Sequence, residues 1–126
     1  MSVVLDASAA LALLLDEPGS EKVVGSIQGA LISSVNMSEV YTKSVDLGKD
    51  VAVARAFFLS LPVRIVSFDD VHARLAGDLR RQTRQYGLSL GDRACLATAM
   101  LEKRSVLTAD KAWLKLDLDI EIISIR

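Results

Sequence analysis

Short apolar segments alternate along this chain with longer segments in which apolar residues recur at helical spacing. The short segments lie at residues 3–5, 30–32, 63–66, 106–108 and 120–125. Strands of a parallel sheet are buried on both faces and read as nearly continuous apolar runs, and each parallel connection needs a crossover, usually a helix. The alternation therefore predicts an α/β fold, a three-layer α/β/α sandwich around a central, mainly parallel sheet.

The segments between the expected strands carry signals for where helices begin and end. Helices are expected over residues 7–15, 20–28, 35–47, 50–61, 70–86, 89–103 and 110–116. Pro18 and Gly19 stop the first of them, while Asp69 is placed to cap the longest, which runs up to Gly87. Since no repeat, low-complexity tract or linker interrupts this order, we expect a single domain over residues 1–126.

The composition is that of a globular protein without a general attraction to nucleic acid. Of the 126 residues, 51% are hydrophobic and the net charge is −1, so any contact with phosphate must come from a local patch. Residues 7–15 are too short to span a bilayer and no basic segment precedes them, which indicates a cytoplasmic protein rather than a membrane protein. The single cysteine, Cys95, excludes an intrachain disulfide and a cysteine cluster for zinc, and is expected in the core.

Four acidic residues lie near boundaries that an α/β fold brings to one edge of its sheet. Asp6 ends the first expected strand, and Asp110 follows the fourth with one residue between them. Glu39 is on the helix after the second strand, and Asp92 is in the first turn of the helix that starts at Ser89. Ligands of open parallel sheets bind outside the carboxyl ends of the strands, so these acids are the candidate catalytic and metal-binding residues.

Each of these acids also has an ordinary structural interpretation. Asp6 and Asp110 stand where helix caps are common, and Asp92 has the spacing of the acidic member of a capping box. Glu39 has Lys43 one helical turn later, which predicts a surface ion pair of about 0.3–0.5 kcal/mol. The set as a whole favours a functional role, because four carboxylates at one edge repel one another unless cations neutralise them.

An acidic cluster without histidine or cysteine suits a hard ion, Mg²⁺ or Mn²⁺. Such an ion lowers the pKa of a bound water and stabilises charge on a phosphoryl oxygen, so phosphodiester hydrolysis at this site needs no side-chain nucleophile. The single histidine, His72, stands among polar residues near the start of the longest helix. It is expected at the surface, without a catalytic role.

Four motifs, in order along the chain, resemble a known family. They are L-D-A-S-A at 5–9, N-M-S-E-V at 36–40, L-S-L-G-D-R-A-C-L-A at 88–97 and V-L-T-A-D at 106–110. With them, nearly the whole chain resembles the PIN-domain ribonucleases, and more narrowly the VapC-type toxins of bacterial toxin–antitoxin pairs. By that resemblance Asp6, Glu39, Asp92 and Asp110 are the acidic quartet that binds Mg²⁺ or Mn²⁺ and cleaves RNA.

The resemblance also implies supporting residues and partners. Ser8 and Thr108 match polar positions beside the quartet. VapC-type toxins usually form homodimers and are held inactive by a cognate VapB-type antitoxin whose C-terminal segment lies across the catalytic groove. For this chain the resemblance implies an RNA substrate, an antitoxin partner and a homodimer.

Three other functions are compatible with parts of the pattern. A catalytically silent PIN-like module that binds RNA or protein would be expected to lack one of the acids, and none is missing. A DNA-directed nuclease of related fold would need an arch or insertion, for which the chain is short. A phosphatase with a nucleophile at Asp6 would need a second aspartate where Ser8 stands. A metal-dependent endoribonuclease is the favoured interpretation, and the silent module is the main alternative.

Basic and aromatic residues near the acids have more than one interpretation. Arg80 and Arg84 share a helix face at i, i+4 spacing and Arg93 adjoins one of the acids, so all three are candidates to hold RNA phosphates. A solvated helix face with an ion pair to Asp78 is the alternative for this group, and a structural ion pair within the acid cluster is the alternative for Arg93. Trp113 is expected in the core or at a dimer interface rather than under a stacked base.

Overall fold

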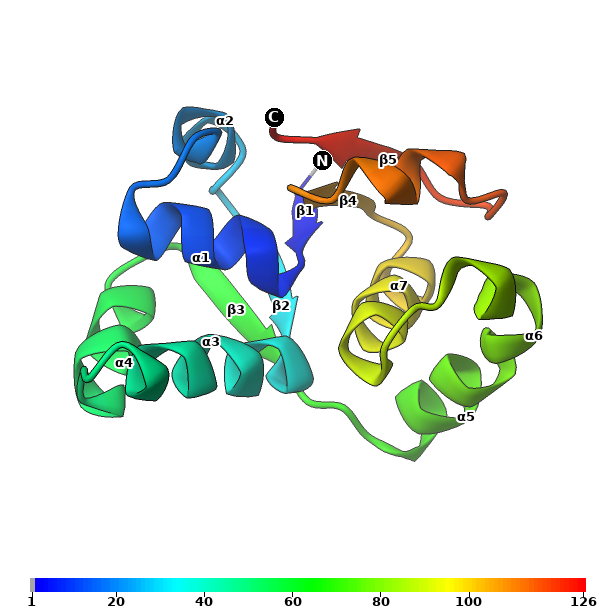
Figure 1. The fold of residues 1–126 in the computed structure, drawn as a ribbon, viewed down its shortest axis with the longest axis horizontal. Helices are drawn as coiled ribbons and strands as arrows, with labels where there is room; N and C mark the ends of the chain where they lie inside the picture. The colour runs from blue at the N-terminus through cyan, green and yellow to red at the C-terminus, as the bar shows by residue number, and fades with distance from the viewer. Residues whose placement is uncertain (1) are drawn as a thin grey trace.

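In the computed structural model, which describes residues 2–126, strands and helices alternate as the apolar pattern predicts (Figure 1). In chain order they are β1 (Val3–Leu5), α1 (Ala7–Leu15), α2 (Ser20–Gly25), β2 (Ala30–Ser33), α3 (Ser34–Asp46), α4 (Val51–Leu59), β3 (Val63–Val66), α5 (Asp70–Asp78), α6 (Arg80–Thr83), η1 (Arg84–Tyr86), α7 (Leu90–Glu102), β4 (Ser105–Thr108), η2 (Lys111–Lys115) and β5 (Ile122–Ser124). The elements η1 and η2 are short 3₁₀ helices. None of the helices within residues 2–126 is both long and apolar enough to cross a membrane.

The five strands form one sheet in the order β3-β2-β1-β4-β5, and every pairing is parallel. The central strand β1 pairs on one side with β2, through Val4 and Leu31, and on the other with β4, through Val4 and Val106. The chain leaves β1 toward one side of the sheet and later returns to the other side, so the carboxyl ends of β1 and β4 meet at a switch point in strand order. The expected parallel sheet is confirmed.

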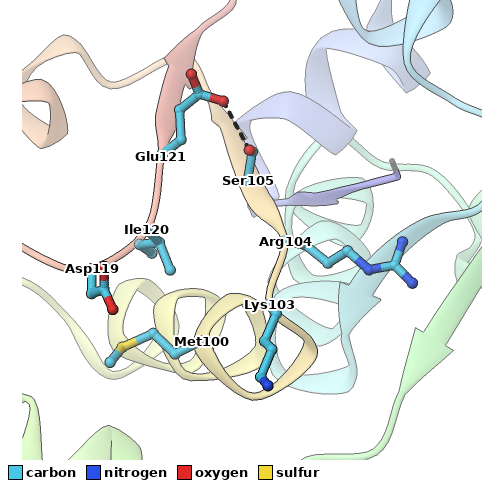
Figure 2. A pocket seen from close by; sticks show the side chains of 7 residues that line it. All are labelled: Met100, Lys103, Arg104, Ser105, Asp119, Ile120 and Glu121. Atoms are coloured by element: carbon cyan, nitrogen blue, oxygen red, sulfur yellow. Dashed lines mark hydrogen bonds between the residues drawn. The ribbon is translucent and has the colours of Figure 1, made fainter.

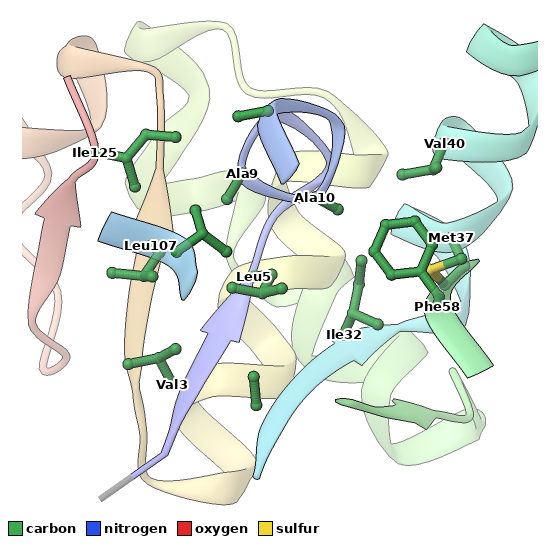
Figure 3. Close-up of a cluster of buried hydrophobic side chains, with 13 residues drawn as sticks. Val3, Leu5, Ala9, Ala10, Ile32, Met37, Val40, Phe58, Leu107 and Ile125 are labelled. Atoms are coloured by element: carbon green, nitrogen blue, oxygen red, sulfur yellow. The ribbon is translucent and has the colours of Figure 1, made fainter. Parts of the chain in front are cut away.

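Alternate residues of the central strand enter two different apolar cores. Val3 and Leu5 lie in the core shared with α1, α2, α3 and α4 (Figure 3). Val4 lies in the core shared with α5, α7 and η2. Both faces of the sheet are therefore covered by helices, which explains why β1 and β2 are buried throughout rather than alternating, whereas the edge strand β3 carries the exposed Arg64. This is the three-layer α/β/α arrangement that the pattern predicts.

The expected long helix over residues 70–86 is wrong in one respect, because the structure divides it into α5, α6 and η1. The carbonyl of Ala76, which a continuous helix would pair with the amide four residues later, accepts a hydrogen bond of 2.8 Å from the Arg93 guanidinium of α7. Further along, the Thr83 hydroxyl donates to the Leu79 carbonyl at 2.8 Å, a contact that bends helices. The expected helices at 20–28 and 110–116 are also shorter than predicted, ending at Gly25 and reduced to η2.

His72 is buried, so the prediction of a surface histidine is wrong. Its residue exposure is 7%, and its ring packs between α5 and α7, edge-on to Phe68 and 3.4 Å from the Thr98 hydroxyl. Polar neighbours in the sequence suggested a surface position, but the inner face of this segment is marked by buried residues at positions 72, 76, 79 and 83. Cys95 and Trp113 are buried as expected, at 0% and 1% exposure.

Candidate active site

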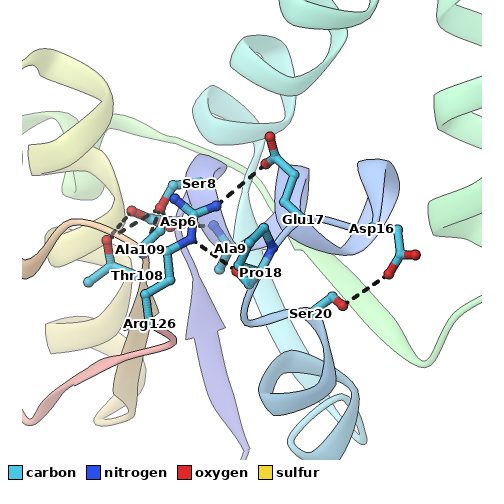
Figure 4. Close-up of polar contacts among 10 residues, drawn as sticks. All are labelled: Asp6, Ser8, Ala9, Asp16, Glu17, Pro18, Ser20, Thr108, Ala109 and Arg126. Atoms are coloured by element: carbon cyan, nitrogen blue, oxygen red, sulfur yellow. Dashed lines mark hydrogen bonds and ion pairs between the residues drawn. The ribbon is translucent and has the colours of Figure 1, made fainter.

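Asp6 lies at the carboxyl end of the central strand and is almost completely enclosed, at 5% exposure (Figure 4). Its Oδ1 accepts hydrogen bonds from the Ser8 hydroxyl at 2.7 Å and the Ala9 amide at 2.8 Å, and its Oδ2 accepts one from the Thr108 hydroxyl at 2.6 Å. Burial raises the pKa of this carboxyl above its ordinary value, although the three hydrogen bonds oppose the rise. The predicted cap of α1 is thus present, and it is also the most enclosed of the four acids.

Ser8 and Thr108 join the end of β1 to the end of β4. The Ser8 hydroxyl accepts a hydrogen bond from the Ala109 amide at 2.9 Å, while the Thr108 hydroxyl accepts one from the Asp110 amide at 3.0 Å. Since both hydroxyls also donate to Asp6, they fix that carboxylate relative to the neighbouring strand. The two polar positions picked out by the resemblance are therefore in contact with the first acid.

The end of β4 is supported in turn by the last residues of the chain. The Ile125 amide donates to the Thr108 carbonyl at 2.9 Å, and the Arg126 guanidinium donates to the Pro18 carbonyl at 2.9 Å (Figure 4). Gly19 has φ of +97°, and a Cβ there would overlap the Ile125 carbonyl. The turn between α1 and α2 therefore needs glycine for this last segment to lie against it.

Glu39 projects from α3 toward the first turn of α7. The Asn36 side-chain amide donates to Glu39 Oε1 at 2.8 Å and to the Gly91 carbonyl at 3.0 Å. A Cβ at Gly91 would overlap the Glu39 carboxylate, so the absence of a side chain there allows the acid to lie against α7. Sequence reasoning missed the roles of Asn36 and Gly91. The predicted ion pair between Glu39 and Lys43 is not formed in the described part of the chain.

Asp92 forms the capping box that the sequence predicts at the start of α7. Its Oδ2 accepts a hydrogen bond from the Ser89 amide at 2.9 Å, and its own amide donates to the Ser89 hydroxyl at 3.1 Å. The structural interpretation is therefore correct, but it does not exclude the functional one. The negative charge of Asp92 adds to the rise in the pKa of Asp6, which places the two carboxylates in the same neighbourhood.

Cys95 lies on α7 about one turn after Asp92, and the charges of nearby acids affect the pKa of its thiol. Burial raises the pKa of its thiol well above the ordinary value, and the charges of Asp6, Asp92 and Glu39 add to the effect, in that order. Three of the four predicted acids therefore surround one end of α7. Asp110 is joined to the end of β4 by the bond from its amide to the Thr108 hydroxyl, and its exposed carboxylate caps η2 by accepting from the Ala112 amide at 3.0 Å.

The four acids meet no cation from the protein within residues 2–126. None of the ion pairs there involves Asp6, Glu39, Asp92 or Asp110. The donor set, carboxylates and hydroxyls only, matches the oxygen ligands that Mg²⁺ and Mn²⁺ prefer. In the same described range no three His, Cys, Asp or Glu side chains are arranged to hold an ion as they stand. The donor chemistry of these residues therefore fits a hard divalent ion.

The predicted RNA-phosphate candidates divide into two kinds. Arg80 and Arg84 are exposed, and Arg84 lines a shallow surface hollow together with Arg81, which pairs with Asp78 at 3.3 Å. Because the predicted helix is broken, Arg80 and Arg84 belong to α6 and η1 rather than to one continuous helix. Arg93 is half-buried, and its guanidinium binds the Ala76 carbonyl instead of an acid.

A hollow of about 420 Å³ lies at the other end of the sheet, at the start of β4 (Figure 2). Its lining includes Lys103, Arg104, Asp119 and Glu121, and the Ser105 hydroxyl donates to Glu121 at 2.9 Å. None of the predicted site residues lines it. The predicted site is at the carboxyl end of the sheet, where Glu39 borders a separate hollow with Phe68, Leu90 and Gly91 among its lining residues.

Comparison with known families identifies one domain over most of the chain. The model of the PIN domain family matches residues 3–118, a range that contains all four acids, both hydroxyls and the three arginines. The chain belongs to the PIN domain family. Among curated proteins none matches this PIN domain.

Solved structures share the fold of this PIN domain over its whole length. A toxin–antitoxin complex from Klebsiella pneumoniae matches with a TM-score of 0.77 and 18% identity, covering 99% of this chain and 98% of that chain. DNA-bound VapBC from Salmonella typhimurium matches with a TM-score of 0.77 and 18% identity, covering 100% and 99%. VapC20 from Mycobacterium tuberculosis, a toxin that cleaves the sarcin–ricin loop, matches with a TM-score of 0.74 and 16% identity, covering 95% and 99%.

Proposed function

We propose that this PIN domain is a Mg²⁺- or Mn²⁺-dependent endoribonuclease and the toxin of a type II toxin–antitoxin pair. The observation that carries the proposal is the grouping of acids from β1, α3, α7 and the start of η2 at one end of the sheet, with no protein cation to neutralise them in residues 2–126. Family membership and the fold shared with toxin–antitoxin structures support it.

The residues of the site have separable roles in this proposal. Asp6, Asp92 and Asp110 hold the metal, and Glu39 either binds an ion or orients the attacking water. Ser8 and Thr108 keep the Asp6 carboxylate fixed through the bonds of 2.7 and 2.6 Å. When bound, the ion supplies a water of lowered pKa and stabilises charge on the phosphoryl oxygen.

Contacts with RNA in this proposal come from exposed arginines. Arg80 and Arg84 have their guanidinium groups available for phosphate, because neither forms an ion pair in the described residues. The bond of Arg93 to the Ala76 carbonyl gives this residue a structural task, and any contact with phosphate would use its remaining donors.

Partners follow from the same proposal. We infer that a cognate VapB-type antitoxin blocks the acidic site and that the toxin acts as a homodimer in the cytoplasm. The similarity to a toxin–antitoxin complex from Klebsiella pneumoniae and to DNA-bound VapBC from Salmonella typhimurium supports the antitoxin.

The direct test is cleavage of a pool of structured cellular RNAs by antitoxin-free protein, with Mg²⁺ or with a chelator, followed by mapping of the new 5′ ends. Asp92→Asn is the test variant, because it keeps the shape of the cap while removing the charge. Asp50→Asn is the matched control, since Asp50 caps α4 through the Ala52 amide at 2.8 Å on a helix that carries none of the acids.

Discrete cuts that need Mg²⁺ and Asp92 but not Asp50 are the expected result. Cuts that persist in the chelator or in Asp92→Asn would contradict the assignment of the site. Mg²⁺ binding without any cut in the RNA pool would favour a catalytically silent module that binds RNA or protein.

A further inference from the structure

Asn36 occupies a core-facing position of α3 where an apolar residue would be expected. It is 1% exposed, and the buried residues Val40 and Ser44 follow it at intervals of four on the same face. Its neighbours along this face pack into the core shared with α1. A buried amide is a costly choice at such a position unless its hydrogen bonds serve a purpose.

Both hydrogens of the Asn36 side-chain amide form hydrogen bonds within the candidate site. Nδ2 donates to Glu39 Oε1 at 2.8 Å and to the Gly91 carbonyl at 3.0 Å. Both partners are acceptors only, so the orientation of the amide is determined by its contacts. The Oδ1 atom has no hydrogen-bond partner in residues 2–126, although it is buried. The Asn36 side chain thus donates to Glu39 and Gly91, while its own Oδ1 accepts no hydrogen bond in residues 2–126.

This contact joins the two helical layers beyond the edge of the sheet. Asn36 and Glu39 belong to α3, which packs in one core, and Gly91 belongs to α7, which packs in the other. Asn36 and Gly91 are 55 residues apart in the sequence, and Asp92 directly follows Gly91. A shift of α3 relative to α7 would therefore change the separation of Glu39 and Asp92.

We propose that Asn36 is a positioning residue that holds the Glu39 carboxylate against the first turn of α7, so that Glu39 and Asp92 face the same Mg²⁺ ion. The inference rests on the proposed function for its metal, and goes beyond it in naming the residue that relates two of the acids. Glu39 is exposed and has a long side chain, so without Asn36 it would sample many rotamers. Loss of a group that orients a metal ligand lowers metal affinity about 10–100-fold.

The first measurement is hydrogen exchange of side-chain amides by NMR. Asn36 is the single asparagine of the chain, and the three glutamines, Gln28, Gln82 and Gln85, are all exposed. The Asn36 amide should exchange much more slowly than the glutamine amides, and its resonances should move in Glu39→Gln and on addition of Mg²⁺. Exchange as fast as in the glutamines, or resonances that ignore Glu39→Gln, would overturn the proposal.

The second measurement is Mg²⁺ affinity by calorimetry of three variants. Asn36→Leu removes both donors and keeps the branched shape of the side chain, and should weaken Mg²⁺ binding about 10–100-fold. Ser44→Ala is the matched control, because Ser44 is a buried polar residue of α3 that bonds only within its own helix, to the Val40 carbonyl at 3.2 Å. It should keep its affinity within about twofold of the parent.

Gly91→Ala serves as a second test that does not depend on the folding of Asn36→Leu. Alanine is well tolerated in helices, but its Cβ would displace the Glu39 carboxylate from α7. Both variants with parental affinity would overturn the positioning role. If the parent itself neither binds Mg²⁺ nor cleaves RNA, the proposed function fails, while the exchange of the Asn36 amide still decides whether this residue holds Glu39.

Discussion

The two ends of the sheet differ in how their charges are distributed. The hollow at the start of β4, of about 420 Å³, has lysine, arginine, aspartate and glutamate in its lining. The hollow that Glu39 lines together with Phe68 and Gly91 at the carboxyl end, of about 540 Å³, has a single charged residue in its lining, a carboxylate. These two hollows are similar in volume and differ in the charges that line them.

Mixed charges neutralise one another and need no ligand, whereas a group of like charges is held only by the folding of the rest of the chain. At Asp6 burial is the largest cause of the raised pKa, three hydrogen bonds oppose the rise, and the charge of Asp92 adds a smaller contribution to it. On the proposed function, a cation bound at the carboxyl end would lower the free energy of the folded protein. Three substitutions, one of them measured in two ways, test this contrast, beginning with the largest expected effect.

Replacement of Asp6 by asparagine should abolish RNA cleavage. The change keeps the shape of the side chain but removes the charge at the most enclosed acid, so we expect a loss of about a thousandfold or more, equivalent to several kcal/mol of transition-state stabilisation. Single-turnover cleavage of an RNA substrate identified by end mapping measures it. Activity within tenfold of the parent would remove Asp6 from the proposed metal site.

Replacement of Arg93 by methionine should affect stability more than RNA binding. The guanidinium donates to the Ala76 carbonyl at 2.8 Å, and loss of this bond between α5 and α7 should lower the free energy of unfolding by about 1–2 kcal/mol. Urea unfolding measures the stability, and RNA affinity in the chelator measures binding. A stable variant with much weaker RNA binding would instead support Arg93 as a phosphate contact and would give the acidic end a cation of its own.

Asp6→Asn should also stabilise the metal-free protein at neutral pH. The free energy of unfolding should rise by about 1 kcal/mol, a common gain from a single stabilising substitution. The folded-state pKa of Asp6 is raised, so the folded protein binds this proton more tightly than the unfolded chain does. Its contribution to stability is present below the unfolded pKa of 3.8 and is lost as the pH rises through the folded pKa.

Urea unfolding in the chelator at several pH values measures this difference between Asp6→Asn and the parent. The advantage of the variant should vanish below pH 3.8, where the parent carboxyl is protonated in both states. Addition of Mg²⁺ should stabilise the parent alone. A parent that is more stable than the variant at neutral pH without metal would contradict the cost of burying the Asp6 charge that its raised pKa implies.

Replacement of Glu121 by glutamine at the opposite end should change very little. Glu121 is exposed, and its hydrogen bond from Ser105 survives in the amide, so the free energy of unfolding should stay within about 0.5 kcal/mol of the parent. Thermal unfolding with and without Mg²⁺ measures the effect. A Mg²⁺-dependent stabilisation that falls in this variant would place a cation site at the wrong end of the sheet.

The parallel sheet and its order of elements follow from local pattern, because strands buried on both faces leave an unmistakable apolar signature. The break in the helix at Leu79 does not follow from local pattern. The Ala76 carbonyl there accepts a hydrogen bond from Arg93, which belongs to a helix distant in the sequence. The same limit applies to the site. Caps such as Asp6 are visible locally, whereas the contact between Asn36 and Gly91 spans 55 residues and depends on how α3 and α7 pack.

Polar neighbours in sequence misled the prediction for His72. The stretch around Asp69, Asp70 and Arg74 is hydrophilic, but the spacing of His72, Ala76 and Leu79 marks an inward face of the helix. Periodicity was the better guide than average polarity at this position. Buried asparagine and histidine residues on such inward faces are missed when a segment is judged by its average polarity.

The rate at which the buried Cys95 thiol reacts with a labelling reagent gives a measure of how often α7 opens. As the single cysteine, fully enclosed and with its pKa raised by burial and by the three acids, it reacts with a thiol reagent only when α7 separates from its neighbours. The rate of labelling in the native protein therefore counts the openings of this helix. A ligand that binds to the acids together would slow the labelling of Cys95.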